Sequence, residues 1–185
     1  DFGCGFLGML GSCVALTSAV HVSSTAEHLA DPELLESEWD LSPLAFDEGE
    51  AGVRRELDDA STRASAFAQM HAGKVAELDQ AGLEAAMREL AEINELVGRA
   101  GSYASLWFST DMAEPARGAL LAHVQERGTE IETKLLFFEL EWAALDDDKA
   151  EALLAAPGLD FCRHYLRSAR RYRPHLLSEP EEKIF

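Results

Sequence analysis

The sequence predicts an all-α protein: a long antiparallel helical hairpin with additional shorter helices and no sheet. Three observations lead to this prediction. Apolar residues recur at alternating steps of three and four over three long stretches, as one face of a helix requires. Capping residues or prolines stand near the start of the later stretches, and glycine or aspartate stands where stretches end. No stretch alternates apolar and polar residues in the manner of a strand.

The chain has 185 residues, about one domain's worth. It has no initiating methionine, and no charged residue lies between Asp1 and Glu27. A secretory signal would begin with basic residues, and glycine, serine and threonine interrupt the apolar run too often for a membrane span. Residues 1–30 are therefore expected to be a poorly ordered or non-native leader, and residues 31–185 to form the helical region.

Two short segments precede the first long helix. In DPELLES (31–37), Asp31 as a cap and Pro32 at the first helical position predict a short turn or helix. In EWDLSPL (38–44), Pro43 is expected to break any helix and to push Ser42 towards extended backbone.

The first long helix is predicted over residues 48–72, with Gly73 ending it. One apolar stripe runs along it, made of Val53, Leu57, Ala60, Ala64, Phe67 and His71. A lone histidine at the end of such a stripe is expected to be a packed or helix-terminal residue rather than a ligand.

The second long helix is predicted over residues 79–109, and its two seams indicate burial on more than one side. The first seam consists of Leu83, Met87, Leu90, Asn94, Val97, Gly101, Ala104 and Phe108. The second consists of Ile93, Leu96, Ala100, Tyr103 and Trp107. Gly98 and Gly101 are expected to permit close approach of another helix.

The third long helix is predicted from Pro115 to Asp146 and has the most regular pattern. Its coiled-coil-like seam is made of Leu121, Val124, Gly128, Ile131, Leu135, Phe138, Trp142 and Leu145. A seam of this length needs a partner, and the second helix is the nearest one along the chain. This reasoning gives the antiparallel hairpin.

Two shorter helices are predicted next, one over residues 145–158, capped by Asp146 and stopped by Pro157, and one over residues 159–175. The second is rich in arginine, interleaved with Tyr165 and Tyr172. Basic and aromatic residues together can bind nucleic acid. The arrangement expected here is instead an arginine face paired with acidic neighbours, with some arginines stacked on aromatic rings. The arginines are Arg163, Arg167, Arg170, Arg171 and Arg173.

The formal net charge is −18, from 34 acidic against 16 basic residues. This charge argues against nucleic acid and against an anionic membrane surface as partners, since both would repel the chain. The three cysteines, Cys4, Cys13 and Cys162, form no C-x-x-C pair, and Cys162 is expected to be a small buried hydrophobe. The cytoplasm is the expected compartment.

No catalytic, cofactor-binding or metal-ligating residue is predicted within this chain. None of the six histidines stands in H-E-x-x-H, and G-x-S-x-G and a P-loop are both missing. His123 and Glu126 lie one helical turn apart, a coincidence common on charged helices. Glu139, Glu141 and the acids at 146–148 have no partner group that would single out a catalytic pair.

Five blocks of sequence carry a family resemblance. They are EWDLSPL (38–44), GKVAELD (73–79), GRAGSYASLWFSTD (98–111), EPARGALLAHVQERGTEIETKLLFFELEWAALDDDKAEALL (114–154) and RRYRPHLLSEPEEKI (170–184). In this order they resemble the amino-terminal region of oligoendopeptidase F and its relatives, within the thimet-oligopeptidase-like zinc metallopeptidases. The resemblance covers roughly residues 37–185.

The resemblance implies an all-α enzyme that hydrolyses internal bonds of short peptides. H-E-x-x-H and a further glutamate hold its Zn²⁺ in the carboxy-terminal half of family members, where the glutamate between the histidines activates water. No residue of this chain corresponds to these ligands, so residues 31–185 would be the helical amino-terminal lobe, truncated before the catalytic domain. Such a chain, taken alone, would bind no zinc and cleave nothing.

The segment LSEPEEKI (177–184) fits this reading, because Ser178, Pro180 and Glu181 predict a capping box at the start of a further helix. The alternative is a stand-alone helical protein-interaction module without catalysis, with the third helix as its binding surface. The sequence leaves the oligomeric state open.

Overall fold

The computed structural model describes residues 40–45 and 48–184, and every structural statement here refers to them. The predicted leader at 1–30 and the predicted turn or helix at 31–37 lie outside the described residues. Within the described part, helices and turns account for the regular structure and no strand occurs. The all-α prediction is confirmed.

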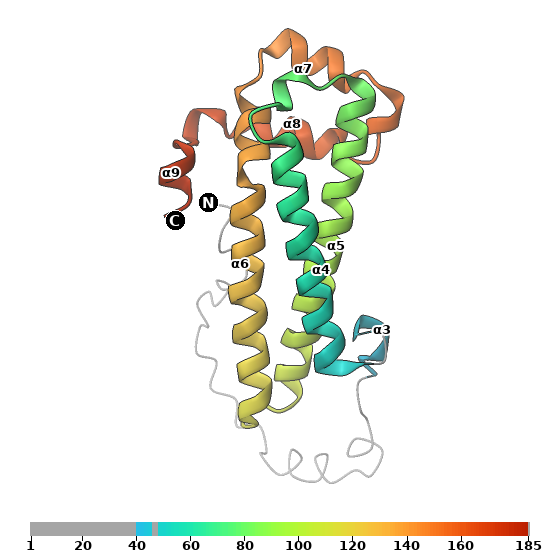
Figure 1. Cartoon of the computed structure of the whole chain (residues 1–185), viewed down its shortest axis with the longest axis vertical. Helices are drawn as coiled ribbons and strands as arrows, with labels where there is room; N and C mark the ends of the chain where they lie inside the picture. The colour runs from blue at the N-terminus through green and yellow to red at the C-terminus, as the bar shows by residue number, and fades with distance from the viewer. Residues whose placement is uncertain (1–39, 46–47, 185) are drawn as a thin grey trace, which may run out of the picture. The chain divides into compact units, whose positions relative to one another are not determined.

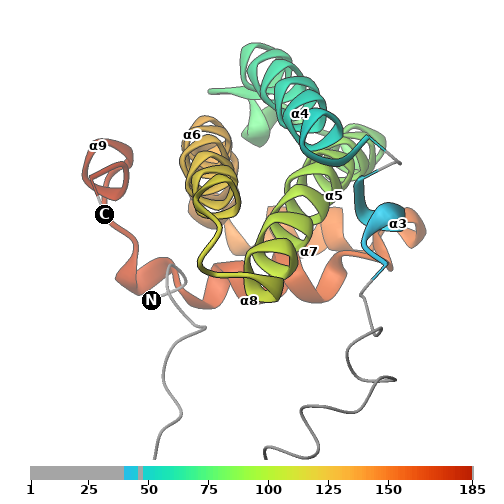
Figure 2. The same cartoon turned by 90° about the horizontal axis from the view of Figure 1, so that it is seen from below.

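Three long helices form the body of the fold: α4 (Gly49–His71), α5 (Gln80–Thr110) and α6 (Pro115–Ala144). Each runs antiparallel to the next along the chain (Figure 1). Seen end-on, the three occupy the corners of a triangle (Figure 2). The predicted α5–α6 hairpin is present, and α4 packs against both of its helices. The seam of α6 therefore has two partner helices instead of the single one expected.

The stripe on α4 forms one side of the core. All six predicted positions are buried, including His71, whose ring centroid lies 4.6 Å from that of Phe67. Phe67 in turn meets Phe138 of α6 with ring centroids 5.5 Å apart. The histidine is a packed helix-terminal residue, as the pattern predicted.

Helix α5 begins where predicted, with the Asp79 carboxylate accepting a hydrogen bond from the Gly82 N–H at 2.7 Å. The predicted seam is wrong at Asn94, which is exposed while its neighbour Ile93 is fully buried. Strict three-four alternation drifts around a helix of 3.6 residues per turn, so a long run of it leaves the buried face.

The predicted role of two α5 glycines is also wrong. A Cβ added at Gly98 or Gly101 would meet no atom of another element within 4 Å. Neither glycine therefore marks a close helix contact. Glycines of α6 approach α5 more closely: an added Cβ would lie 3.6 Å from the Phe108 side chain at Gly118 and 3.8 Å from the Val97 side chain at Gly128.

The seam of α6 is buried as predicted from Val124 to Trp142, and Leu145 beyond the helix is buried too. At the first turn of the seam the chain buries Leu120 more fully than Leu121. The Glu114 carboxylate and Pro115 begin the helix, with Pro115 in the first turn, where its missing N–H needs no partner.

The prediction that Pro43 breaks any helix and makes the backbone at Ser42 extended is wrong. A short helix, α3 (Ser42–Ala45), begins at Ser42. The Asp40 carboxylate accepts hydrogen bonds from the Ser42 N–H at 3.0 Å and from its hydroxyl at 2.6 Å. These bonds cap the helix, and proline is tolerated within a first turn. Helix α3 packs against α4 and α5 (Figure 1).

Short elements complete the chain. A 3₁₀ turn, η1 (Val75–Glu77), joins α4 to α5. After α6 come α7 (Asp147–Leu154), η2 (Pro157–Leu159), α8 (Arg163–Arg171), η3 (Arg173–His175) and α9 (Glu179–Glu182). Helices α7 and α8 lie across one end of the bundle, and α9 lies beside α6 (Figures 1 and 2).

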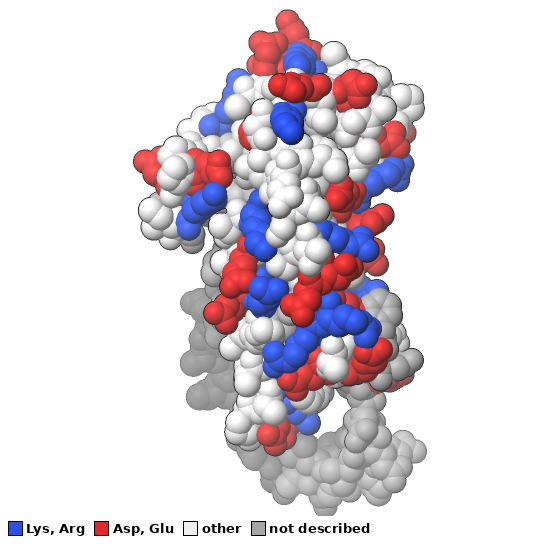
Figure 3. Space-filling view, viewed as in Figure 1, with Lys and Arg blue, Asp and Glu red and all other residues white. Residues whose placement is uncertain are grey.

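Acidic and basic side chains are interspersed over the long helices on the face shown in Figure 3. Two arginines link neighbouring helices: Arg63 pairs with Glu92 at 3.0 Å, and Arg127 pairs with Asp58 at 3.1 Å. These exposed pairs orient the helices more than they stabilise them. No helix in the described ranges is both long enough and apolar enough to cross a membrane.

Candidate functional site

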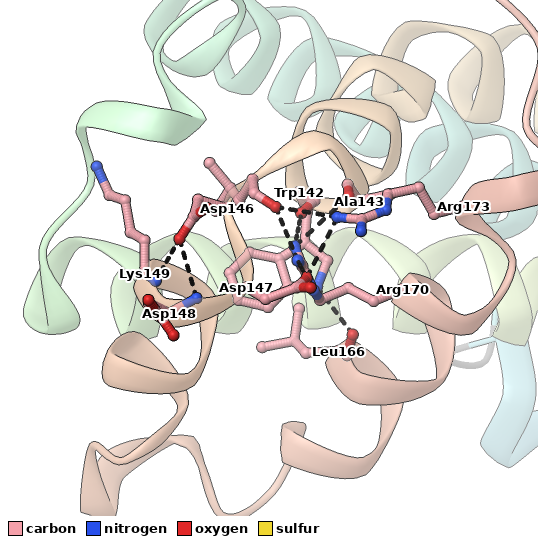
Figure 4. Close-up of polar contacts among 10 residues, drawn as sticks. Trp142, Ala143, Asp146, Asp147, Asp148, Lys149, Leu166, Arg170 and Arg173 are labelled. Atoms are coloured by element: carbon pink, nitrogen blue, oxygen red, sulfur yellow. Dashed lines mark hydrogen bonds and ion pairs between the residues drawn. The ribbon is translucent and has the colours of Figure 1, made fainter.

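Trp142 fixes the elements that close the end of the bundle. It lies in the last turn of α6 and is 1% exposed. Its indole N–H donates a hydrogen bond to the backbone carbonyl of Leu166, in α8, at 2.8 Å (Figure 4). Leu166 is itself fully buried. A large apolar ring with one satisfied polar atom thus anchors α8 against the end of α6.

Arg170 of α8 supports the same junction through its guanidinium fork. It donates hydrogen bonds to the carbonyls of Trp142 at 2.8 Å and Leu145 at 2.7 Å, with a longer one to Ala143 at 3.5 Å (Figure 4). These carbonyls belong to the end of α6, where the helix offers them no N–H. The guanidinium carbon also lies 5.7 Å from the centre of the Trp142 ring. A cation at a helix carboxyl end is favoured by the helix dipole as well.

Asp147 completes this network at the start of α7. It accepts a hydrogen bond from Arg170 and one from Arg173 at 3.2 Å. The hydrogen bond from Arg170, followed by the charge of Arg173, lowers the pKa of Asp147. Its neighbour Asp146 caps α7, accepting from the Asp148 N–H at 3.0 Å, as predicted.

Two more arginines of this region, Arg163 and Arg167, act in the same way. Arg163 donates to the carbonyls of Leu154 at 2.8 Å and Ala156 at 2.9 Å, which lie at the end of α7. Arg167 pairs with Glu151 of α7 at 2.9 Å. The predicted arginine face with acidic partners is confirmed for these side chains. The predicted stacking of an arginine on an aromatic ring is confirmed for Arg170, whose guanidinium lies over the ring of Trp142 in α6.

Glu141, on the same turn of α6 as Trp142, binds the connection between α4 and α5. Its two carboxylate oxygens accept hydrogen bonds from the backbone N–H groups of Gly73 at 2.7 Å and Val75 at 3.2 Å. Gly73 has a φ of 76°, in the left-handed region that glycine adopts without strain. One carboxylate therefore holds the turn that follows α4 against α6.

Comparison with models of protein families gave a match to the part of the chain that contains these elements. Residues 141–185 match the model of the amino-terminal domain described as oligopeptidase F. The chain carries an oligopeptidase F-like amino-terminal region. Comparisons with curated proteins and with solved structures gave no match.

The oligopeptidase F-like segment coincides with the closing elements of the fold. It begins at Glu141 and includes Trp142, Arg170 and Asp147, together with α7, α8 and α9. The side chains that hold the bundle end together thus lie inside the matched segment. The resemblance stated from the sequence is supported over this part of the chain.

Within this segment, α9 begins with the predicted capping box. The Glu181 carboxylate accepts hydrogen bonds from the Ser178 hydroxyl at 2.5 Å and from the Ser178 N–H at 2.9 Å. The bond from the hydroxyl, followed by the bond from the backbone, lowers the pKa of Glu181. Helix α9 touches α6 and leaves a groove beside it, lined by residues of α6 and of the chain from Arg173 to Glu179.

No group of three or more histidine, cysteine, aspartate or glutamate side chains in the described ranges is placed so that it could hold a metal ion. His123 is half-buried and Glu126 is exposed. Cys162 is buried as predicted, and its burial raises the pKa of its thiol.

Sequence reasoning named Glu139 among acids without a partner and overlooked its surroundings. Glu139 lies on α6, which packs against both α8 and α9. Partial burial, followed by the charge of Glu182, raises the pKa of Glu139. Partial burial and the charge of Glu139 likewise raise the pKa of Tyr165. No local pattern signals this meeting of three elements, because it depends on how α8 and α9 fold back on α6.

Proposed function

We propose that this chain is the helical amino-terminal region of a zinc metalloendopeptidase of the oligopeptidase F kind, which hydrolyses internal bonds of short peptides. The observation that carries the proposal is the family match over residues 141–185. The all-α architecture of the described residues supports it. Short peptides are the proposed substrates of the whole enzyme, and the cytoplasm is its proposed compartment.

In this proposal the catalytic zinc and its ligands belong to sequence outside this chain. The contribution of the present residues is structural: the three-helix bundle forms a wall of the peptide channel, and the arginine-braced elements join it to the remainder. Arg170 and Trp142 keep α8 fixed to the bundle, so that α9 leaves it in a defined direction. A rigid wall restricts access to flexible, short substrates.

The test compares two proteins, this chain and the product of its longer reading frame. We expect the longer product to contain about one zinc per molecule and to cleave an internally quenched peptide, with chelation abolishing cleavage. The present chain should show neither property. Zinc-dependent cleavage by the chain alone would overturn the assignment of catalysis to residues elsewhere.

The same experiment addresses the interaction-module alternative. If the longer product folds but binds no zinc and cleaves no peptide, the peptidase proposal is wrong and a helical binding role takes its place. Nucleic acid is not a proposed partner, given the formal net charge of −18.

A further inference from the structure

Glu56 of α4 is a carboxyl group enclosed in the core without a hydrogen-bond partner. The residue is 5% exposed, and the buried Val53 and Ala60 lie one helical turn away on either side of it. Neither carboxylate oxygen accepts a hydrogen bond from the described residues. Its ion-pair partner is Arg99 of α5, whose Nη2 lies 3.9 Å from Glu56 Oε1, beyond hydrogen-bond distance.

These surroundings favour the neutral form of Glu56. An ionised carboxylate buried without a donor loses its hydration and gains nothing in exchange, whereas a neutral carboxyl group loses much less. Burial accordingly raises the pKa of Glu56, and the charges of Arg99 and Arg55 lower it only in part. Among the described residues, α3 carries no titratable side chain, and no charge of α6 is among those that act on Glu56. The described packing is therefore that of the protonated side chain.

The start of α4, where Glu56 lies in the second turn, is weakly secured. Glu48 at the N-cap makes no side-chain capping bond, whereas α5, α6 and α7 each begin with a carboxylate that does. Gly49 and Gly52 both lie among the first four residues of α4, and glycine is a poor helix former. The ion pair between Glu48 and Arg55 is exposed and stabilises little. The first two turns of α4 are thus held mainly by packing.

Helix α5 supplies the surface against which these turns pack. Gly49 enters α4 with a φ of 54°, and a Cβ added there would lie 3.5 Å from the Tyr103 hydroxyl. Arg99 stands one helical turn before Tyr103 on α5. The start of α4 therefore lies over this turn of α5, and separation of the two helices there would bring Glu56 into contact with water.

We propose that Glu56 is a pH switch for the start of α4. When it is protonated, the side chain stays in the core and residues 49–56 remain packed on α5. When it releases the proton to solvent, the carboxylate moves into water and these two turns separate from α5, while the rest of the bundle stays folded. Opening of this end therefore becomes more frequent as pH rises.

The test is backbone amide hydrogen exchange on this chain, so it does not depend on the peptidase proposal. Amides of residues 53–57 report on the start of α4, and amides of residues 131–135 report on the middle of α6. Rates are corrected for the pH dependence of exchange in an unfolded chain. We expect the opening constant at 53–57 to exceed that at 131–135. It should rise about tenfold per pH unit between the ordinary glutamate pKa and the raised folded value, and level off above it.

Three variants identify the group that titrates. Glu56→Gln keeps the side-chain shape and cannot ionise, so the opening constant at 53–57 should no longer depend on pH. Glu50→Gln removes an exposed carboxylate from the first turn of the same helix and should leave the pH dependence unchanged. Arg99→Gln removes a charge that favours the ionised form, so the rise should level off at a higher pH than in the wild type. Circular dichroism confirms that each variant folds.

Two results overturn the proposal. One is an opening constant at 53–57 that does not change with pH in the wild type, or that changes equally in Glu56→Gln. The other is an equal opening constant at 53–57 and at 131–135, which would show that Glu56 reaches water only when the whole bundle unfolds.

Discussion

Replacement of Arg170 by alanine tests whether the arginine fork holds the closing elements to the bundle. Its side chain is 12% exposed and donates two short hydrogen bonds, to the carbonyls of Trp142 at 2.8 Å and Leu145 at 2.7 Å. A hydrogen bond from a charged donor contributes roughly 1.5 kcal/mol or more. The two together put the loss in the free energy of unfolding at about 3 kcal/mol. The weak bond to Ala143 and the exposed Asp147 add little to this value.

The assay is urea unfolding followed by circular dichroism. Arg171→Ala is the matched control, because Arg171 is exposed on the same helix and should change stability by less than about 0.5 kcal/mol. Arg170→Lys retains the charge but cannot serve both carbonyls in the same planar geometry, so its loss should fall between the two. A loss in Arg170→Ala no larger than that in Arg171→Ala would refute the reasoning.

Three further predictions follow from named residues. Gly98→Ala should stabilise the chain by about 1 kcal/mol, because the site is helical and open, whereas Gly73→Ala should destabilise it by at least that much, because φ is positive there; urea unfolding gives both signs. Burial raises the pKa of Glu56, so the folded state holds its proton more tightly and wild-type stability declines as pH rises from the ordinary carboxyl value through the folded one. Glu56→Gln should remove that decline, measured as the difference between variant and wild type across this range. Hydrogen bonding from Arg170 lowers the pKa of Asp147, so its stabilising effect exists above the ordinary aspartate value and is lost as pH falls through the folded value. The destabilisation in Asp147→Asn should therefore shrink in acid, and a loss independent of pH would contradict the cause given.

The helices were predictable because their signals are local. The predicted bounds of α4 are correct to within a residue at each end, α5 begins near Asp79 as expected, and Asp146 caps α7 as expected. A cap bonds to N–H groups two or three residues away, and a stripe needs only the helical period. Both can be read without knowing what lies across the core.

The predictions from sequence were wrong where contacts with other parts of the chain determine the burial or the backbone conformation of a residue. Asn94 of the first predicted seam is exposed, whereas Ile93 of the second seam is fully buried, so the packed neighbours and not the helical period decide which of the two faces the core. Gly98 resembles a close-packing residue in sequence, but it faces away from the other helices. Asp40 accepts a hydrogen bond from the Ser42 N–H, and this bond outweighs the usual preference for extended backbone before proline.

The candidate site was the least predictable part. Arg170 acts mainly on backbone carbonyls, and no side-chain pattern in the sequence shows which carbonyls a helix end leaves without partners. Glu139 and Glu182 are far apart in the sequence, and the charge of Glu182 acts on Glu139 only because α9 packs beside α6. The family resemblance indicated the region, and the structure supplies the contacts within it.

The measurement that tests the central claim most directly is the DNA sequence beyond the codon for Phe185. The account predicts that the open reading frame continues and encodes an H-E-x-x-H followed by a further glutamate, the ligands that a zinc peptidase requires. A stop codon directly after Phe185, or a continuing frame without this motif, would contradict the proposal that the chain is part of a zinc endopeptidase.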